Sequence, residues 1–438
     1  YTDMGINGAF CTTFTRPDRV ADIAGGSLET VCDGKTGMFF YEQTADAIVN
    51  AVKEFETMGS APFKYEDCRS WAERFSEERF KREIKEFVEE KYKEFNKYLS
   101  MNYFITGGTG FIGTHLTNLL QELHPECNVY NLDIVEPGTP LPSVEDYKPA
   151  LRKGQKLAST FIRCDVRKPI VLEGVNVTAD DVIFNFAAVH RTPGHPDYAY
   201  FETNVLGAEN VTAFAEKYGI KKIVFTSSIA PYGAAEELKE ETTVPTPNTP
   251  YGISKLVAEK IHMIWQARNQ AERQLTIVRP GVVFGKGENG NFTRLYWGIR
   301  GGKFIYPGRK DTVKACIYVK ELVRFMLYRL EHHEQGVELY NCTFEPAYTI
   351  EQIVETMKKV TDLKKVVPLI PAWVLMPVAT VIGCLGAPMG ICPARVKKLM
   401  ISTNICGKKL SSSGYKFHYS FEEAIADWYK DNDNLYLK

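Results

Sequence analysis

The sequence predicts an α/β protein whose larger part is a doubly wound parallel sheet with helices on both faces. Beyond about residue 100, short apolar runs rich in β-branched residues alternate with helical stretches, as is typical of parallel sheets. These runs are residues 128–134, 182–187, 222–227 and 275–278. A glycine-rich turn follows the first strand of this part, at 101–106. An amphipathic helix precedes that strand and separates the part with the parallel sheet from an N-terminal segment.

The composition is that of a folded protein with more than one domain. The chain has 438 residues, 44% hydrophobic and 24% charged, against about 100 to 200 residues in an ordinary domain. Because 53 Lys and Arg balance 54 Asp and Glu, no positive excess is available to bind nucleic acid. The cysteines form no C-x-x-C pair and no histidines have metal-ligand spacing, so we expect no metal and a cytoplasmic location.

One apolar stretch bears on that location. Residues 366–394 carry no charge and are long enough to span a bilayer. Their many prolines and glycines disfavour a continuous helix. We therefore expect the stretch to fold over the substrate pocket. Membrane contact, and with it membrane association, is the alternative. The chain starts at Tyr1, and no secretory signal is visible.

An amphipathic helix is predicted after Ser76, which is a suitable N-cap before the acidic Glu77 and Glu78. Apolar residues then recur with helical spacing, at Phe80, Ile84, Phe87, Val88, Tyr92, Phe95 and Leu99. We place a domain boundary at about residue 100, directly after this helix.

The N-terminal segment carries a Gly25-Gly26 turn, the run 33–40 and the run 72–81. On these motifs, residues 20–98 resemble the C-terminal tail of retaining glycosyltransferases of the GT-B type, with two Rossmann-like halves. In that family the Gly-Gly turn opens a helix beside the donor diphosphate. The family's donor-binding carboxylates lie upstream of this turn, and Glu29 is the first Glu here. The resemblance therefore implies a truncated segment, either a remnant or a docking module.

A second glycine-rich turn follows the strand at 101–106 and opens a helix. Its glycines permit a close approach of the backbone to a pyrophosphate at the helix N-terminus. The predicted cofactor contacts are Gly107, Gly110, Phe111, Ile112 and Gly113. About 20 residues later a strand ends at Asp133, whose carboxylate can bind a ribose 2′-hydroxyl and repel a 2′-phosphate. The pattern predicts NAD rather than NADP.

Two further strand ends are predicted to lie along the cofactor. One strand ends at Asp165 and Val166, and another at Ala187 and Ala188. The small alanines would let the cofactor lie against the edge of the sheet.

A catalytic group is predicted on a later helix. Tyr251 and Lys255 stand one helical turn apart on the same face. A neighbouring ammonium and a positively charged nicotinamide ring would both lower the pKa of the tyrosine, so that it can exchange a hydroxyl proton. Ser228 ends a strand where its hydroxyl can orient the same substrate oxygen. We predict Ser228, Tyr251 and Lys255 as catalytic, the last two also contacting the cofactor.

With these three residues in this order after the glycine turn, residues 101–438 resemble the extended short-chain dehydrogenases, which include NAD-dependent nucleotide-sugar epimerases and dehydratases. Other family motifs lie at 203–207, 232–233, 279–285, 318–319 and 410–417. The resemblance implies a Rossmann-type NAD-binding domain at 101–285 and a smaller C-terminal substrate-binding region at 286–438, after the segment 1–100. It also implies a homodimer.

The resemblance assigns further site residues. It implies that Asn204 supports the active site beside the cofactor, and that Ser228, Asn291 and Lys314 contact the substrate. Relatives usually carry Arg where Lys314 stands and Asp where Glu321 stands, which leaves the substrate class open. His190 and His195 follow the alanine strand near the expected substrate.

Ile229 and Ala230 follow Ser228, where sugar dehydratases carry an Asp-Glu pair for the elimination of water. We therefore expect an NAD-dependent epimerase acting on a nucleotide-diphosphate sugar through a transient keto intermediate. One alternative is a hydroxysteroid-dehydrogenase-like or lipid-linked-sugar oxidoreductase, whose apolar substrate the stretch 366–394 would shelter. Another, from a different class, is a docking scaffold for a glycosyltransferase.

Overall fold

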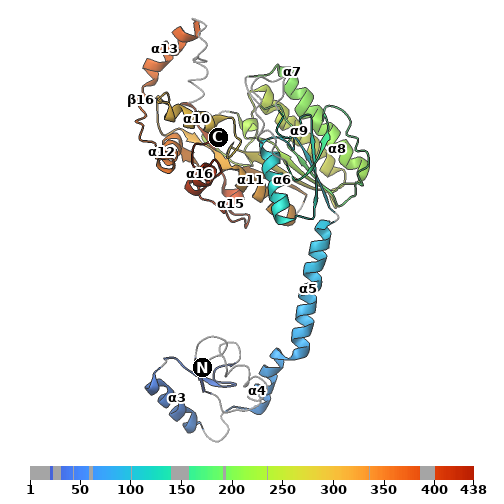
Figure 1. Ribbon diagram of the computed structural model, residues 1–438, viewed down its shortest axis with the longest axis vertical. Helices are drawn as coiled ribbons and strands as arrows, with labels where there is room; N and C mark the ends of the chain where they lie inside the picture. The colour runs from blue at the N-terminus through green and yellow to red at the C-terminus, as the bar shows by residue number, and fades with distance from the viewer. Residues whose placement is uncertain are drawn as a thin grey trace. The chain divides into compact units, whose positions relative to one another are not determined.

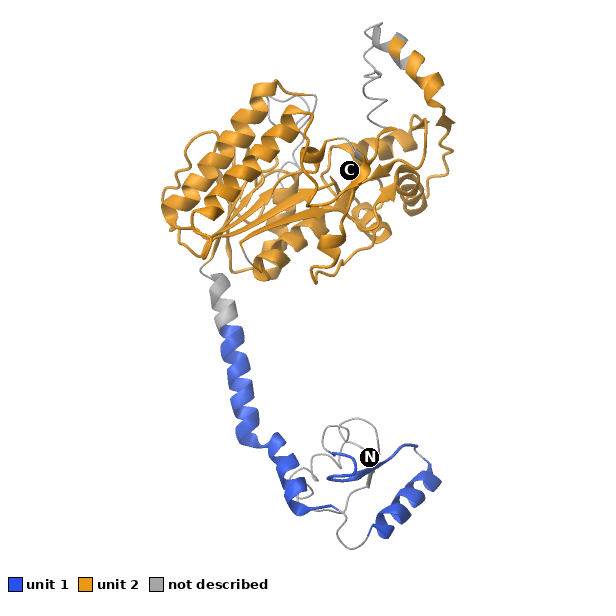
Figure 2. Cartoon of the chain, turned by 180° about the vertical axis from the view of Figure 1, so that it is seen from behind, with its two compact units in different colours: residues 1–97 blue, residues 98–438 orange. Residues whose placement is uncertain are grey.

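The computed structural model divides the chain into two compact units, residues 1–97 and 98–438 (Figures 1 and 2). The described residues are 20–22, 31–42, 44–58, 63–99, 101–139, 157–190, 194–233, 235–334, 336–384 and 400–438. The predicted Gly25-Gly26 turn lies outside these residues.

The first unit contains a short parallel strand pair and helices. Its elements are β1 (Val20–Asp22), β2 (Met38–Phe40), α3 (Ala45–Thr57), α4 (Tyr65–Ala72), a 3-10 turn (Glu73–Phe75) and α5 (Glu77–Leu99). The helix predicted after Ser76 is confirmed, and the Ser76 hydroxyl accepts a hydrogen bond from the backbone N–H of Arg79 at 3.3 Å. Its apolar side chains stay exposed, with Phe80 66% and Phe87 56% accessible.

The second unit is built on a seven-stranded parallel sheet, which confirms the predicted fold class. The strands in chain order are β3 (Asn102–Thr106), β4 (Asn128–Asp133), β5 (Thr160–Arg163), β6 (Val182–Asn185), β7 (Lys222–Thr226), β9 (Gln274–Pro280) and β14 (Val337–Cys342). Their spatial order is β14-β9-β7-β6-β3-β4-β5. The chain reverses its direction of winding between β3 and β6, and such switch points are where open α/β sheets bind ligands.

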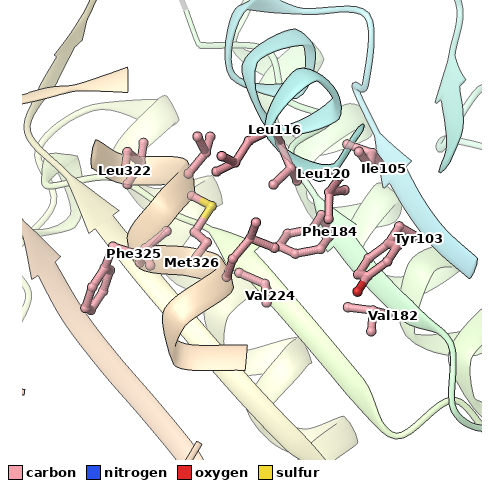
Figure 3. Close-up of a cluster of buried hydrophobic side chains, with 14 of the residues drawn as sticks. Tyr103, Ile105, Leu116, Leu120, Val182, Phe184, Val224, Leu322, Phe325 and Met326 are labelled. Carbon is pink, nitrogen blue, oxygen red and sulfur yellow. The ribbon is translucent and has the colours of Figure 1, made fainter. Parts of the chain in front are cut away.

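Helices cover both faces of this sheet. The main ones are α6 (Phe111–Leu123), α8 (Leu206–Tyr218), α9 (Pro250–Ala267) and α11 (Val319–Glu331). Alternate residues of β3 point to opposite faces. Tyr103 and Ile105 pack against α6 and α11 (Figure 3), whereas Phe104 packs against α8 and α9. Both faces are buried, so the strands read as continuous apolar runs.

The C-terminal part adds smaller elements around a third core. They are β8 (Ala235–Lys239), β10 (Val282–Phe284), α10 (Asn291–Arg300), β11 (Tyr306–Pro307), β12 (Val313–Lys314), β13 (Cys316–Tyr318), β15 (Tyr348–Thr349), α12 (Ile350–Val360), β16 (Leu369–Ile370), α13 (Ala372–Cys384), β17 (Thr403–Ile405), α15 (Lys408–Ser411) and α16 (Phe421–Lys430). Aromatic side chains such as Phe284, Phe421 and Trp428 fill this core.

The expectation that the apolar stretch 366–394 folds over the substrate pocket stays a prediction, and the described part of the stretch has exposed side chains. Val366 is 88% and Trp373 is 78% exposed, while residues 385–399 lie outside the described part of the chain. Pro377 stands inside α13. No helix among the described residues is long and apolar enough to cross a membrane.

We predict that a chain beginning at Met101 folds and keeps NAD-dependent turnover. The parallel sheet and its two cores use residues from Met101 onward, and Met101 itself is buried in one of them. The melting temperature and turnover of this shortened chain should match those of the full chain. Insoluble or unfolded material would contradict the prediction.

Candidate active site

The glycine turn lies where β3 meets α6, and two of its glycines are required by close contacts. Gly107 has a φ of +68°, and a Cβ there would lie 2.8 Å from the backbone nitrogen of Ala187. A Cβ at Gly113 would lie 2.5 Å from the carbonyl oxygen of Gly108. At Gly110, the N-cap of α6, a Cβ would meet only the Gly107 carbonyl among the described residues. Backbone N–H groups at this helix N-terminus can bind an anionic group such as a pyrophosphate.

Asp133 ends β4 beside this turn. Its carboxylate accepts hydrogen bonds from the backbone nitrogen and the hydroxyl of Thr109, at 3.2 and 2.9 Å, and from the backbone nitrogen of Ile134 at 2.8 Å. Burial raises the pKa of Asp133, and these hydrogen bonds oppose that effect. Asp133 thus holds the turn in place. A contact with a ribose remains a prediction and would share oxygens that are already hydrogen bonded.

The other predicted cofactor residues follow β5 and β6. The Asp165 carboxylate lies 2.7 Å from the guanidinium of Arg167, and this hydrogen-bonded pair lowers the pKa of Asp165. Val166 is buried against Gly207, and a Cβ at Gly207 would lie 3.0 Å from the Val166 side chain. The backbone nitrogen of Ala187 contacts the Thr106 hydroxyl at 3.5 Å, and Ala188 follows half-buried. Because the carboxyl ends of parallel strands share one edge, these residues line the same side of the sheet as the glycine turn.

Tyr251 lies in the first turn of α9. Thr249 caps this helix by accepting a hydrogen bond from the backbone N–H of Gly252 at 3.1 Å, and Pro250 occupies the first helical position. Burial raises the pKa of Tyr251 to about 12, and a hydrogen bond with the Ser228 hydroxyl opposes this rise. The structure therefore brings Tyr251 and Ser228 together as predicted.

Lys255 also lies on α9, but the expected lowering of the Tyr251 pKa by this ammonium is wrong for the protein without cofactor. Lys255 is 2% exposed, and its Nζ donates a hydrogen bond to the carbonyl oxygen of Thr226 at 2.8 Å. Burial lowers the pKa of Lys255 to about 7, although the negative charge of Glu259 has the opposite, smaller effect. Desolvation outweighs charge attraction because both side chains are withdrawn from water.

Asn204 connects α9 to the end of β6. It lies in a π-helical turn, 201–205, and is buried. Its amide oxygen accepts a hydrogen bond from the backbone nitrogen of Val189 at 2.9 Å, and its amide nitrogen donates to the Val189 carbonyl and to the Ser254 hydroxyl. These bonds fix the register of the catalytic helix against the sheet. A direct contact of Asn204 with the cofactor stays a prediction.

Sequence reasoning missed a buried carboxylate beneath this site. Glu259, one helical turn after Lys255, accepts hydrogen bonds from the Ser227 hydroxyl at 2.5 Å and from the Arg279 guanidinium at 2.8 and 2.6 Å. All three side chains are at most 3% exposed. The signal was the spacing Tyr251, Lys255, Glu259, which continues one face of the helix.

A second buried polar connection was also missed. His262 lies one turn further along α9 and stacks on Phe225 with ring centroids 4.2 Å apart. Its Nε2 lies 3.2 Å from the amide nitrogen of Asn185, and the amide oxygen of Asn185 accepts a hydrogen bond from the Thr106 hydroxyl at 2.7 Å. Burial lowers the pKa of His262 to about 4. A neutral His262 can accept the Asn185 hydrogen bond, and it links α9 to the strand that carries the glycine turn.

The residues predicted on the substrate side lie on separate elements. Asn291 begins α10 and accepts a hydrogen bond from Arg294 at 3.2 Å. The Nζ of Lys314 donates to the Ile401 carbonyl at 2.7 Å. His195 packs edge-on against Tyr200, whose ring centroid lies 6.2 Å from that of Tyr251.

Glu321, which departs from the family pattern, has a structural role. Its buried carboxylate accepts hydrogen bonds from the Tyr415 hydroxyl at 2.5 Å and from the backbone nitrogens of His418 and Tyr419 at 2.7 Å. It therefore holds the closing segment against α11.

The chain is similar to known epimerases. Residues 103–343 match the family model described as the NAD dependent epimerase/dehydratase family. The chain is 31% identical over 336 residues to an N-acetyl-alpha-D-glucosaminyl-diphospho-ditrans,octacis-undecaprenol 4-epimerase of Escherichia coli O157:H7, covering 74% of this chain and 93% of that protein. It is 31% identical over 166 residues to a UDP-glucose 4-epimerase of Halalkalibacterium halodurans, covering 37% and 45%.

Solved structures share the fold. A Thermus thermophilus UDP-glucose 4-epimerase in complex with NAD has a TM-score of 0.56 at 20% identity, covering 76% of this chain and all of that one (100%). A UDP-N-acetylglucosamine 4-epimerase of Methanobrevibacter ruminantium has a TM-score of 0.56 at 21% identity, covering 76% and 98%. The family model and the relative from Escherichia coli support the expectations of an NAD cofactor and of an epimerase. The chain belongs to the NAD dependent epimerase/dehydratase family.

Proposed function

We propose that this chain inverts the configuration at C4 of a hexose that is attached to a diphosphate. The observation that carries the proposal is the placement of Tyr251, in the first turn of α9, beside Ser228 at the edge of the sheet where the glycine turn opens. Ile229 and Ala230 follow Ser228 in place of the acid and base that dehydration needs. The four relatives named above are described as 4-epimerases.

The cofactor fits the cradle formed by Gly107, Gly110 and the N-terminus of α6, with Asp133 beside it. Bound there, NAD would supply the hydride acceptor and donor that inversion at a sugar carbon requires. Tyr251 moves the hydroxyl proton in each direction, and Ser228 orients the same oxygen. Lys255 and Asn204 hold α9 and its tyrosine against the sheet. We propose that Asn291 and Lys314 contact the diphosphate of the substrate.

We take a nucleotide as the first candidate for the group on the other side of the diphosphate. A polyprenyl carrier is the second candidate, favoured by the relative from Escherichia coli and by the exposed apolar helix α13. Lys314 presents a point charge to either diphosphate.

We also propose that the enzyme is a homodimer, as is common among extended short-chain dehydrogenases. For residues 20–98 we propose a glycosyltransferase-like module without transferase activity. The exposed apolar side chains of α5 support a docking role for this module.

Replacing Tyr251 with Phe should lower turnover by roughly 10²- to 10⁴-fold, because the variant loses the acid-base hydroxyl and keeps the ring. NAD affinity should stay unchanged, as measured by calorimetry. Tyr65→Phe is the matched control, since this phenol is exposed and lies in the first unit. Undiminished turnover in Tyr251→Phe would contradict the mechanism.

Replacing Lys255 with Met should lower turnover and stabilise the cofactor-free protein at neutral pH. The folded-state pKa of Lys255, about 7, lies below its ordinary value, so the unfolded chain binds more protons between about pH 7 and 10 and wild-type stability rises with pH there. The variant should melt a few degrees higher near pH 7, with the difference shrinking toward about pH 10. Lys260→Met, an exposed lysine on the same helix, should leave the melting profile unchanged. Equal pH profiles for wild type and Lys255→Met would count against the buried ammonium.

The purified enzyme should interconvert a nucleotide hexose and its C4 epimer without net formation of NADH. The same cofactor removes and returns the hydride, so proton NMR should show two sugars at equilibrium while absorbance shows no accumulated NADH. The substrates to test are UDP-glucose and UDP-N-acetylglucosamine, and the same two sugars attached to a polyprenyl diphosphate. Stoichiometric NADH would favour the oxidoreductase alternative. Co-purification of a glycosyltransferase without any turnover would favour the scaffold.

A further inference from the structure

An exposed apolar segment, residues 366–384, stands out from the second unit. Val366, Leu369 and Trp373 are 88%, 46% and 78% exposed. The segment contains no charged residue, and α13 is apolar around its whole circumference. Figure 1 shows α13 standing apart from the helices that cover the sheet. A helix that is hydrophobic on all sides is ordinarily buried or in contact with lipid.

The segment is anchored at its base. Leu369 and Ile370 pair with Tyr306 and Pro307, and the backbone nitrogen of Gly308 donates to the Ile370 carbonyl at 2.8 Å. A Cβ at Gly308 would lie 3.2 Å from Ala372 and 3.0 Å from Met400. The next residue after Met400 accepts the hydrogen bond of Lys314. The segment therefore leaves the fold beside a residue predicted to bind substrate.

All charged residues that surround the segment in the sequence, between Asp362 and Glu422, are basic. Between Asp362 and Glu422 the chain has no Asp or Glu. The basic residues in this range are Lys364, Lys365, Arg395, Lys397, Lys398, Lys408, Lys409 and Lys416. Lys364 and Lys365, directly before the segment, are exposed. In a chain whose charges otherwise balance, this bias complements an anionic surface.

We propose that residues 366–384 dock on the surface of an anionic phospholipid bilayer. The apolar side chains enter the boundary between headgroups and acyl chains, and Lys364 and Lys365 contact the anionic headgroups. At 13 residues and with Pro377 inside, α13 is too short to span the bilayer. A second copy of the chain would cover the apolar side chains equally well, but it would not account for the eight basic residues between Asp362 and Glu422, among which Lys364 has its Nζ 3.6 Å from the exposed Asp362 carboxylate. The inference does not depend on the proposed sugar substrate.

Flotation of the full chain with vesicles tests the proposal. Vesicles of phosphatidylcholine with about one-third phosphatidylglycerol should carry the protein, and pure phosphatidylcholine vesicles should carry much less. The variant Trp373→Ser with Val374→Ser should lose at least about tenfold in affinity. Phe87→Ser with Val88→Ser, which removes two similarly exposed apolar residues from α5 (56% and 55%), is the matched control and should bind normally. Binding that depends on the α5 pair and is indifferent to the α13 pair would overturn the proposal.

The charge contribution is measured separately. Lys364→Gln with Lys365→Gln should weaken binding to the anionic vesicles by roughly 30-fold, while the exposed Lys168→Gln should have no effect. Brominated lipid should quench the fluorescence of Trp373, and the loss of that quenching in Trp373→Phe identifies the residue. Melting temperature and turnover of UDP-sugars should be the same in all variants, which separates failed docking from failed folding or failed catalysis. Equal binding to neutral and anionic vesicles, or a change of oligomeric state in the α13 pair without any vesicle binding, would refute membrane docking.

Discussion

The buried carboxylate of Glu259 is the constraint on which the active site depends. It joins three elements, because it extends from α9 and accepts hydrogen bonds from Ser227 at the end of β7 and from Arg279 on β9. A carboxylate withdrawn from water is tolerated only when it is paired and hydrogen bonded, and removing one partner of such a pair typically costs about 3–5 kcal/mol. Any shift of α9 along the sheet would break these bonds. The helix can therefore hold Tyr251 in only one position relative to Ser228.

The cofactor side is fixed by a different means, the close packing of backbone. Gly107 approaches Ala187 and Gly113 approaches Gly108 more closely than any Cβ allows. Thr106, Asn185 and His262 then connect this packed turn to α9 through buried hydrogen bonds. The two halves of the site, the cofactor cradle and the catalytic helix, are held at one distance by interactions that involve neither the cofactor nor the substrate.

The sequence was sufficient for features that depend on local patterns. The helix after Ser76, the glycine turn at 107–113 and the strands of the parallel sheet all have short-range signals in spacing and residue type. The protonation of Lys255 could not be predicted in this way, because it depends on how deeply tertiary packing withdraws the ammonium from water. The spacing of Tyr251 and Lys255 indicated attraction between their charged forms, and burial instead disfavours both of those forms. The exposure of α13 was missed for the same reason, since an apolar run does not itself show whether the fold covers it.

The polar groups around the active site are hydrogen bonded within the fold, whereas two helices elsewhere expose apolar side chains to water. Around Tyr251 the polar groups of Ser227, Glu259 and Asn204 are bonded within the described fold, so this region is built to keep one geometry. The apolar side chains of α5 and α13 are instead left in water, where each exposed square ångström of apolar surface is unfavourable by about 25 cal/mol relative to burial. Covering these side chains, by a partner or by lipid, therefore lowers the free energy. The second unit thus holds a rigid site, while α5 and α13 carry the exposed apolar surfaces through which we propose that the chain associates with a partner and with a bilayer.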